Sequence, residues 1–421
     1  MTALTLPTGG DPATAAGEIH RIELPTGLLV LKVDPGPFLL DDLIGFAARA
    51  NAKRGFLFLS KVLGKHWPVT PRKMHDIHTE LAMQIPANLP GPVVFIAMAE
   101  TAIGLGQGVF EAYQAAHLDS EALFIHTSRY HVGDSPIIEF EEAHSHAPRQ
   151  FLHLPTSVML QKLLLSARSL VLVDDEASTG NTFINLTTAF RVLNPAIGRV
   201  HLATIANFMG HAANEALSKR FGLTVTIGTA LRGEYSFTVG QMQQPGNAAQ
   251  LFEAHADRGA SSEFGRLGVT GPLSWPNELA DRLIASIEQG ERVLVLGTGE
   301  FMHMAFLLGR ALELRDVNVV VQSTTRSPIL QWGAVSHVLS FPDNYGEGVE
   351  NFVYNVYPGQ YDHVFICHET LPNPALNQIA QALNGRLIHF LSEKHCEEIS
   401  DRKSTRLNSS HRNTSRMPSS A

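Results

Sequence analysis

The chain has 421 residues, 44% of them hydrophobic, 17% charged and 8% aromatic, which predicts two or three ordinary α/β domains and excludes a disordered, fibrous or disulfide-rich protein. Cys367 and Cys396 form no CxxC pair, no apolar run is long enough to cross a membrane, and residues 1–17 lack a secretory signal, so we expect a cytoplasmic protein without a thiolate zinc site. The net charge of −8 argues against a nucleic-acid partner but leaves room for local phosphate-binding pockets.

Apolar strand-like runs alternate with helical patterns over residues 27–228, as in a mostly parallel sheet covered by helices. Strands are predicted at Leu28–Val33, Val93–Met98, Leu123–His126, Leu170–Val173, Val200–Ile205 and Thr224–Ile227. Helices are predicted at Leu39–Asn51, Pro71–Met83, Gly106–Ala116, Asn181–Leu193 and Ala212–Arg220. The alternation indicates a doubly wound α/β domain.

Two strand ends in this block carry polar residues suited to a ligand. The strand ending at Met98 leads into Glu100 and a glycine-rich run, which reads as an anion-binding loop or as a capped helix start. Glu100 could hold Mg²⁺ through water. The next strand ends near Arg129, whose guanidinium suits a phosphate oxygen.

Two further clusters of charge lie in loops. Residues 53–68 hold Lys61, Lys65 and His66 around a glycine turn, and a solvated basic edge is the equal alternative. Residues 130–150 form a long excursion, and loops of this length are usually functional or disordered. The cluster inside it suits diphosphate and substrate contacts better than zinc, and its members are Glu142, His144, His146 and Arg149.

The most informative segment is LVLVDDEASTGNT, residues 170–182, in which an apolar strand ends in two acids and a short polar loop enters a helix. Free N–H groups and the positive dipole end at such a loop favour a phosphate. Asp174 and Asp175 would repel that phosphate and instead suit sugar hydroxyls. The combination predicts a site for a phosphorylated sugar, and an ordinary capped turn is the alternative.

A polar stretch, residues 241–262, reads as a linker to a second α/β pattern. Its predicted strands are Arg292–Leu296, Asn318–Gln322 and His363–Ile366, and its predicted helices are Pro276–Gln289, Phe301–Leu314 and Pro374–Leu383. A Gly-x-Gly loop and a hydroxyl-rich strand end form a candidate anion site in this block. Its members are Gly297, Gly299, Thr325, Arg326 and Ser327.

Residues 401–421 break the composition of everything before them and resemble a translated sequencing-library adapter, so we expect a non-native tail. Without the five basic residues and one acid of this tail, the net charge is −12. A disordered basic tail is the alternative, and the true C-terminus beyond Ser400 stays open.

Residues 170–182 resemble the phosphoribosyl-diphosphate (PRPP) signature of type I phosphoribosyltransferases, which consists of four apolar residues, two acids, a short spacer and Thr-Gly-x-Thr. The run from Thr325 to Pro328 resembles the TRSP signature of a domain that follows an orotate-phosphoribosyltransferase-like family. The resemblance implies a type I phosphoribosyltransferase fold, a parallel sheet flanked by helices with a hood and flexible loop at 130–150, and then a second Rossmann-like α/β domain. The expected division is 1–240, a linker at 241–262, a TRSP domain at 263–400 and the tail.

By the same resemblance, Asp174 and Asp175 contact the ribose hydroxyls, Arg129 assists the leaving diphosphate, and further residues bind PRPP. These further residues are Lys61, Lys65, Glu100, Thr101, Ala102, Ser178, Thr179, Gly180, Asn181 and Thr182. An acid precedes the threonine in some purine-using members, whereas this chain has Ser178, so the loop offers no general base.

The resemblance implies a Mg²⁺-dependent phosphoribosyltransferase that transfers ribose 5-phosphate from PRPP to a base-like acceptor. Family members are often encoded with tellurium-resistance and stress-response genes and are thought to help make a nucleoside-like metabolite. Two alternatives stay open: a non-catalytic protein that senses PRPP or a nucleotide, and an enzyme that runs the reaction in reverse. The acceptor and the role of the TRSP domain are open, and a homodimer is one expectation because type I relatives commonly dimerise.

Overall fold

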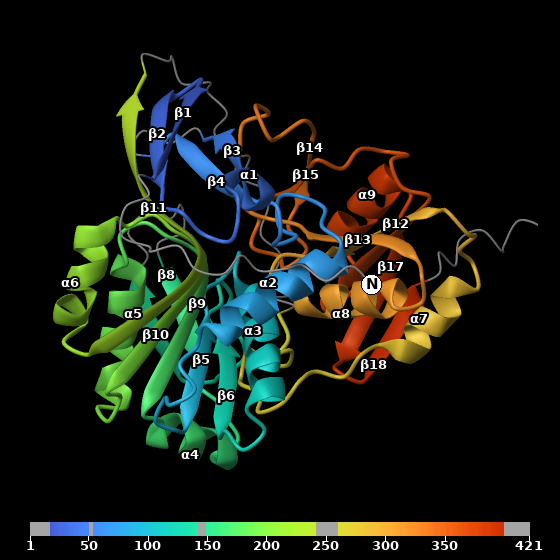
Figure 1. Cartoon of the computed structure of the whole chain (residues 1–421). Helices are drawn as coiled ribbons and strands as arrows, with labels where there is room; N and C mark the ends of the chain where they lie inside the picture. The colour runs from blue at the N-terminus through green and yellow to red at the C-terminus, as the bar shows by residue number, and fades with distance from the viewer. Residues whose placement is uncertain (1–16, 50–53, 142–148, 241–259, 400–421) are drawn as a thin grey trace, which may run out of the picture.

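The first domain is organised around a seven-stranded sheet in the order β1-β2-β11-β10-β9-β5-β6 (Figure 1). The computed structural model describes residues 17–49, 54–141, 149–240 and 260–399. The strands that pair in parallel are β5 (Val93–Ala97), β6 (Ala122–His126), β9 (Ser169–Ala177), β10 (Arg199–Asn207) and the first half of β11 (Thr224–Val239). All five include strands predicted from the sequence.

Continuous apolar runs form these strands because both faces of the sheet are covered. Alternate residues of β9 supply the two cores: Val171 and Val173 belong to one cluster, and Leu170 and Leu172 to the other. One face is covered by α2 (Pro71–Met83) and α3 (Ile103–Ala116). The opposite face is covered by α4 (Val158–Ser166), α5 (Asn181–Leu193) and α6 (His211–Phe221).

The order of the parallel strands defines a topological switch point. In chain order they are arranged 2-1-3-4-5, so the connections leave in opposite directions from the neighbouring strands β5 and β9. Ligands of doubly wound sheets bind at the carboxyl ends of the two strands that flank this point. We therefore expect a ligand to bind near the residues that follow Ala97 and Val173.

The antiparallel edge of this sheet and a separate β3–β4 hairpin form a cap, which contains elements that the sequence did not predict. It is built from β1 (Glu18–Leu24), β2 (Gly27–Val33), the second half of β11, β3 (Ile44–Ala48) and β4 (Phe56–Ser60). The helix predicted at Leu39–Asn51 is wrong, because only α1 (Leu40–Leu43) is helical before β3 begins. Cross-strand pairing of β3 with β4, whose Phe56 and Phe58 rings pack on Tyr235, outweighs the helical pattern.

The second domain is a smaller α/β unit of the Rossmann-like kind. Its sheet has the order β13-β12-β16-β17-β18, in which β18 alone runs antiparallel to its neighbour. The strands are β12 (Arg292–Gly297), β13 (Asn318–Ser323), β16 (His363–His368), β17 (Arg386–Ser392) and β18 (His395–Ile399), with a separate hairpin of β14 (Val338–Pro342) and β15 (Glu350–Tyr354). The helices are α7 (Asn277–Ile284), α8 (His303–Glu313) and α9 (Pro374–Leu383). The predicted strands and helices are confirmed, although α7 ends earlier than expected.

The two domains pack side by side, with α2 and α3 of the first against α8 of the second (Figure 1). Val69 and Val321 exchange backbone hydrogen bonds across this junction at 2.7 and 3.0 Å. The predicted linker lies outside the described residues except for its last three positions. No helix in the described part of the chain has the length and apolar character that a membrane span needs.

Candidate active site

A pocket of about 450 Å³ lies at the switch point, where the carboxyl ends of β5 and β9 meet. Residues 98–101 after β5 line it, as do residues 174–180, 182 and 183 at the end of β9 and the start of α5. The β3–β4 hairpin contributes Arg49, Arg54 and Leu57, and the second domain contributes residues 325–328. The volume and the mixture of charged and apolar walls suit a small metabolite.

The polar loop after β9 presents a helix N-terminus to the pocket. Gly180 precedes α5 with φ +74°, a left-handed conformation that glycine adopts without strain. Ser178, Thr179 and Thr182 also line the pocket, so hydroxyl donors and the positive dipole end favour an anion there. Asn181 instead accepts a 2.6 Å hydrogen bond from Arg220 and does not line the pocket.

The paired acids Asp174 and Asp175 lie next to this loop, on the same wall of the pocket. The backbone N–H of Asp175 donates to Asp174 Oδ1 at 2.9 Å. Burial raises the pKa of Asp175 to about 6, and a hydrogen bond between the side chains of Asp175 and Asp174 opposes that shift. The neighbouring acid, Glu176, pairs with Arg54 at 2.5 and 2.7 Å, so its charge is compensated by the cap.

The two lysines predicted to bind PRPP have different surroundings. Lys65 is fully buried beside the pocket, pairs with Glu100 at 2.5 Å and donates to the carbonyl oxygen of Gly299 at 2.9 Å. Burial lowers the pKa of Lys65, and Glu100 counteracts this effect. Lys61 lies outside the pocket, at a smaller surface cavity, and donates to the carbonyl oxygen of Asp41.

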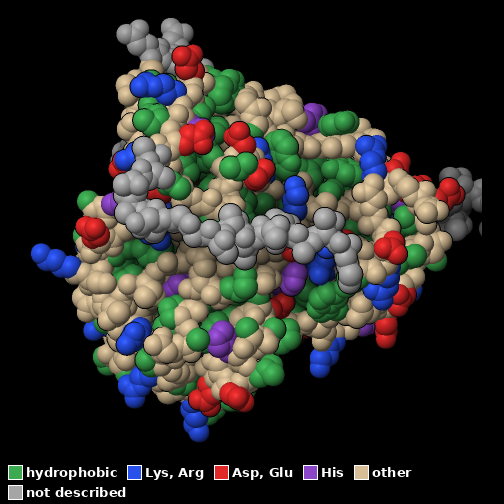
Figure 2. Space-filling model, viewed as in Figure 1, with side chains coloured by type: hydrophobic (Ala, Val, Ile, Leu, Met, Phe, Trp, Pro, Cys, Tyr) green, Lys and Arg blue, Asp and Glu red, His purple; other side chains and the backbone are tan. Residues whose placement is uncertain are grey.

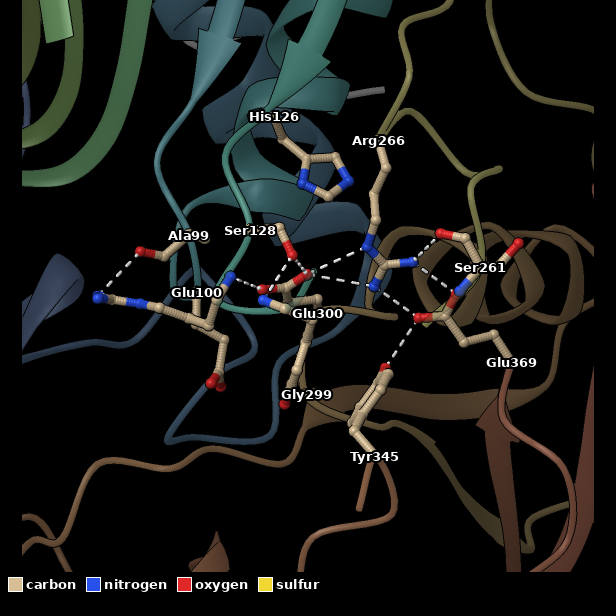
Figure 3. A network of polar contacts seen from close by, with 12 residues as sticks. Ala99, Glu100, His126, Ser128, Ser261, Arg266, Gly299, Glu300, Tyr345 and Glu369 are labelled. Carbon is tan, nitrogen blue, oxygen red and sulfur yellow. Dashed lines mark hydrogen bonds and ion pairs between the residues drawn. The ribbon is translucent and has the colours of Figure 1, made fainter. Parts of the chain in front are cut away.

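The predicted loop after β5 contributes Glu100 and Thr101 to the pocket, whereas Ala102 is buried at the start of α3. Arg129 also lines the pocket, and its side chain donates to the carbonyl oxygen of Ala99 at 3.4 Å (Figure 3). The loop after β5 and the segment after β6 therefore line the same pocket as the loop that contains Gly180.

The segment expected to form the hood, residues 130–150, does not line the pocket in its described part. It forms a hairpin of β7 (Ile137–Glu141) and β8 (Arg149–His153), which packs beside α5. Three of the predicted loop residues, Glu142, His144 and His146, lie outside the described residues, and Arg149 is described only as the first residue of β8. The β3–β4 hairpin covers the pocket instead, through Arg49 and Arg54.

The five residues of the candidate anion site predicted in the second domain do not all line one pocket. Thr325, Arg326 and Ser327 line the pocket of the first domain, whereas Gly297 and Gly299 do not. The Gly-x-Gly loop carries Glu300, which together with Glu369 surrounds the buried guanidinium of Arg266 (Figure 3). This ion cluster fills the end of β12 and β16, the switch point of the second sheet, with protein side chains.

Several residues at the pocket had no role in the sequence analysis. They are Arg49, Arg54, Glu176 and Val349. Glu176 is the third consecutive acid at the end of β9, which was a usable signal for it. Nothing local connects Arg54 to it across more than a hundred residues. Burial and the charge of Lys65 lower the pKa of His66 to about 3, so its imidazole is neutral at pH 7.

Lys and Arg side chains of the described residues are scattered over the face shown in Figure 2 rather than gathered in one broad patch.

Comparison with protein families gives two matches. Residues 43–234 match a family described as phosphoribosyl transferase, and residues 265–383 match the TRSP domain C-terminal to that family. A comparison with curated proteins found no match.

Solved structures similar to this chain include adenine phosphoribosyltransferase from Rhodothermus marinus, at 14% identity, 45% coverage of this chain, 95% of that chain and a TM-score of 0.29. The enzyme from Trypanosoma brucei, in complex with AMP, pyrophosphate and ribose-5-phosphate, has 13% identity, 50% and 87% coverage and a TM-score of 0.32. Orotate phosphoribosyltransferase from Aeropyrum pernix has 15% identity, 42% and 79% coverage and a TM-score of 0.25.

Proposed function

Because the chain belongs to the phosphoribosyltransferase family and carries the TRSP domain that follows it, the protein is a pentosyltransferase, and we propose that its donor is PRPP. The observation that supports this donor is the juxtaposition of Asp174 and Asp175 with the loop at residues 178–182, at one switch point. The loop suits the 5-phosphate, and the two acids suit the ribose hydroxyls.

The reaction follows from what these groups can hold. A lone pair of the acceptor forms a bond to C1 of the ribose, the C1–O bond to diphosphate breaks, and its electron pair leaves with the diphosphate. A nitrogen acceptor that carries a proton loses it in the same turnover. Positive charge develops on the ribose, so fixed carboxylates at Asp174 and Asp175 stabilise the transition state, and Arg129 stabilises the leaving group.

Mg²⁺ is the cofactor that this donor implies, and the residues present fit it. Mg²⁺ takes one or two carboxylates and completes its shell with substrate phosphates and water, so no dedicated cage is needed. The described residues contain no cluster of three metal-ligating side chains. Because Glu100 already pairs with Lys65, Asp174 and Asp175 are the better candidates to hold the ion. Bound Mg²⁺ would neutralise part of the diphosphate charge.

We propose that the acceptor is a small base-like molecule that enters between the sugar site and the β3–β4 hairpin. Leu57 and Met98 give this region apolar walls, and Arg49 adds a cation. The product would be a nucleotide-like precursor of a nucleoside-like metabolite, formed by a Mg²⁺-dependent enzyme in the cytoplasm.

Isothermal titration of the full chain with PRPP, with and without Mg²⁺, tests the donor. We expect Mg²⁺-dependent binding by the wild-type chain and by the control Asp119→Asn, an exposed position at the other end of the sheet. Asp174→Asn/Asp175→Asn should lose most of that binding while remaining folded. Unchanged binding in the double variant would contradict the assignment of PRPP to this site. If PRPP binds but no acceptor causes the release of diphosphate, the protein is better explained as a PRPP sensor.

A further inference from the structure

Arg326 belongs to the second domain and lines the pocket at the switch point of the first domain. Its Nη1 nitrogen is buried and has no hydrogen-bond partner among the described residues. Among the residues that the structure describes, no carboxylate lies within ion-pair distance of this guanidinium. The guanidinium interacts with Tyr130. A buried cation without a carboxylate partner nevertheless costs free energy, so a bound anion would compensate its charge.

Three other buried cations, unlike Arg326, have a carboxylate partner. Arg54 pairs with Glu176, Lys65 pairs with Glu100, and Arg266 pairs with Glu300 and Glu369. Those pairs compensate their charges within the protein and leave little positive charge for a ligand. Arg326 is therefore the cation best suited to an external anion among these four.

A stack of aromatic rings holds Arg326 in place. Its guanidinium carbon lies 5.3 Å from the centre of the Tyr130 ring, which stacks on Tyr345 with ring centres 4.3 Å apart. The hydroxyl of Tyr345 lies 2.9 Å from Glu369 and 3.0 Å from the carbonyl oxygen of Thr298, so the stack is anchored in the buried ion cluster. A cation held on an aromatic face is preorganised for a ligand.

The position of Arg326 indicates which part of PRPP its guanidinium would contact. Tyr130 directly follows Arg129, and Glu100, in the loop after β5, is one of the charges that raise the pKa of Arg326 against the opposing effect of burial. Arg326 lies over the ring of Tyr130, so it is close in space to Arg129. Because the proposed function assigns the leaving diphosphate to Arg129, Arg326 would meet the same end of PRPP.

We propose that Arg326 of the TRSP segment binds the diphosphate of PRPP, so that the two domains form one active site. The hydroxyls of Thr325 and Ser327 line the same wall. The Arg266 cluster occupies the switch point of the second sheet, and the residues that follow β13 line the pocket of the first domain. The inference rests on the proposed donor.

Titration of the full chain with three probes tests this role: PRPP, inorganic diphosphate and ribose 5-phosphate, which lacks the diphosphate. For Arg326→Gln, the Kd of PRPP and of diphosphate should rise about 10- to 100-fold, because a charge-assisted contact is lost. The Kd of ribose 5-phosphate should change less than about twofold. Arg326→Lys should recover part of the loss, since it restores the charge without the guanidinium fork.

The matched control is Arg292→Gln, at the opposite end of β12, which should bind all three probes like the wild-type chain. Equal binding of PRPP by Arg326→Gln and the wild-type chain would overturn the inference and leave the donor intact. Equal losses for PRPP and ribose 5-phosphate would also overturn it, because the effect would not depend on the diphosphate. If the wild-type chain binds no PRPP, the proposed function fails and the inference fails with it.

Discussion

The carboxylate of Glu300, in the second domain, accepts a 2.7 Å hydrogen bond from the backbone N–H of Arg129, at the end of β6 in the first domain (Figure 3). Its other oxygen accepts a 2.8 Å bond from Ser128 Oγ. The second domain thereby holds the strand end that presents Arg129 to the pocket. Glu300 is a positioning residue in this arrangement and does not line the pocket.

Replacing Glu300 should affect both stability and PRPP binding. In Glu300→Ala, the N–H of Arg129 loses its acceptor and Arg266 loses one of two carboxylates, so we expect a loss of about 2 to 5 kcal/mol in urea unfolding. Glu300→Gln keeps an acceptor oxygen and should bind PRPP better than Glu300→Ala. The exposed Glu288→Ala is the control. Wild-type affinity for PRPP in a folded Glu300→Ala would refute the positioning role.

The buried pair of Lys65 and Glu100 makes a second prediction about the junction. Lys65→Met leaves the Glu100 carboxylate without its cation, so we expect a loss of about 3 to 5 kcal/mol in unfolding free energy. The double variant Lys65→Met/Glu100→Gln should recover much of it, because no buried charge is left alone. Lys61→Met, outside the pocket, should stay within about 0.5 kcal/mol of the wild-type chain. Additive effects in the double variant would contradict the pairing.

The pKa of Asp175 makes the stability of the unliganded protein depend on pH. Because this pKa is about 6, above the ordinary value of 3.8, the folded chain binds the proton more tightly than the unfolded chain. The contribution to stability is therefore full below about pH 4 and is lost as the pH rises through 6. The loss should be about 1 to 3 kcal/mol, and it belongs to the coupled acid pair.

Urea unfolding of the wild-type chain and Asp175→Asn at pH 4.5 and pH 7.5 measures this effect. The variant cannot ionise at that position, so it should gain stability relative to the wild-type chain at pH 7.5 and lose most of this advantage at pH 4.5. An equal difference at both pH values would show that Asp175 does not titrate in this range.

The sequence predicted the parts of this fold whose signals are local. Pro71–Met83 and Asn181–Leu193 are helices with the predicted bounds, because each combines helical periodicity with a Pro or Gly start signal. The charged, alternating β1 and the short β3 and β4 were missed. Their stability depends on the pairing of β1 with β2, on the pairing of β3 with β4, and on the packing of Phe56 and Phe58 against Tyr235 of β11. Antiparallel edges of this kind depend on partners distant in the sequence.

The same distinction applies to the site. The acids at 174–175 and the loop at 178–182 were identified because one contiguous segment contains them. The convergence of Arg54 and Arg326 on that segment depends on packing between elements that are far apart in the chain. For the same reason, the sequence analysis assigned Arg326 to a separate anion site in the second domain. A pocket shared by two domains has no local signature in the sequence.

Gly180 and Gly222 offer a matched test of the phosphate loop, since both adopt left-handed φ values, +74° and +64°. Alanine at either position should cost about 1 kcal/mol of backbone strain. At Gly222 an added Cβ meets open space, whereas at Gly180 it lies 3.1 Å from Met209 Sδ, and this residue lines the pocket. Both variants should therefore lose similar stability, but only Gly180→Ala should weaken PRPP and ribose 5-phosphate together, by about tenfold or more. Calorimetric unfolding and titration distinguish these effects. Equal phosphate affinity in the two variants would mean that the 5-phosphate binds elsewhere, because a backbone change at the start of α5 must disturb any anion held by its N–H groups.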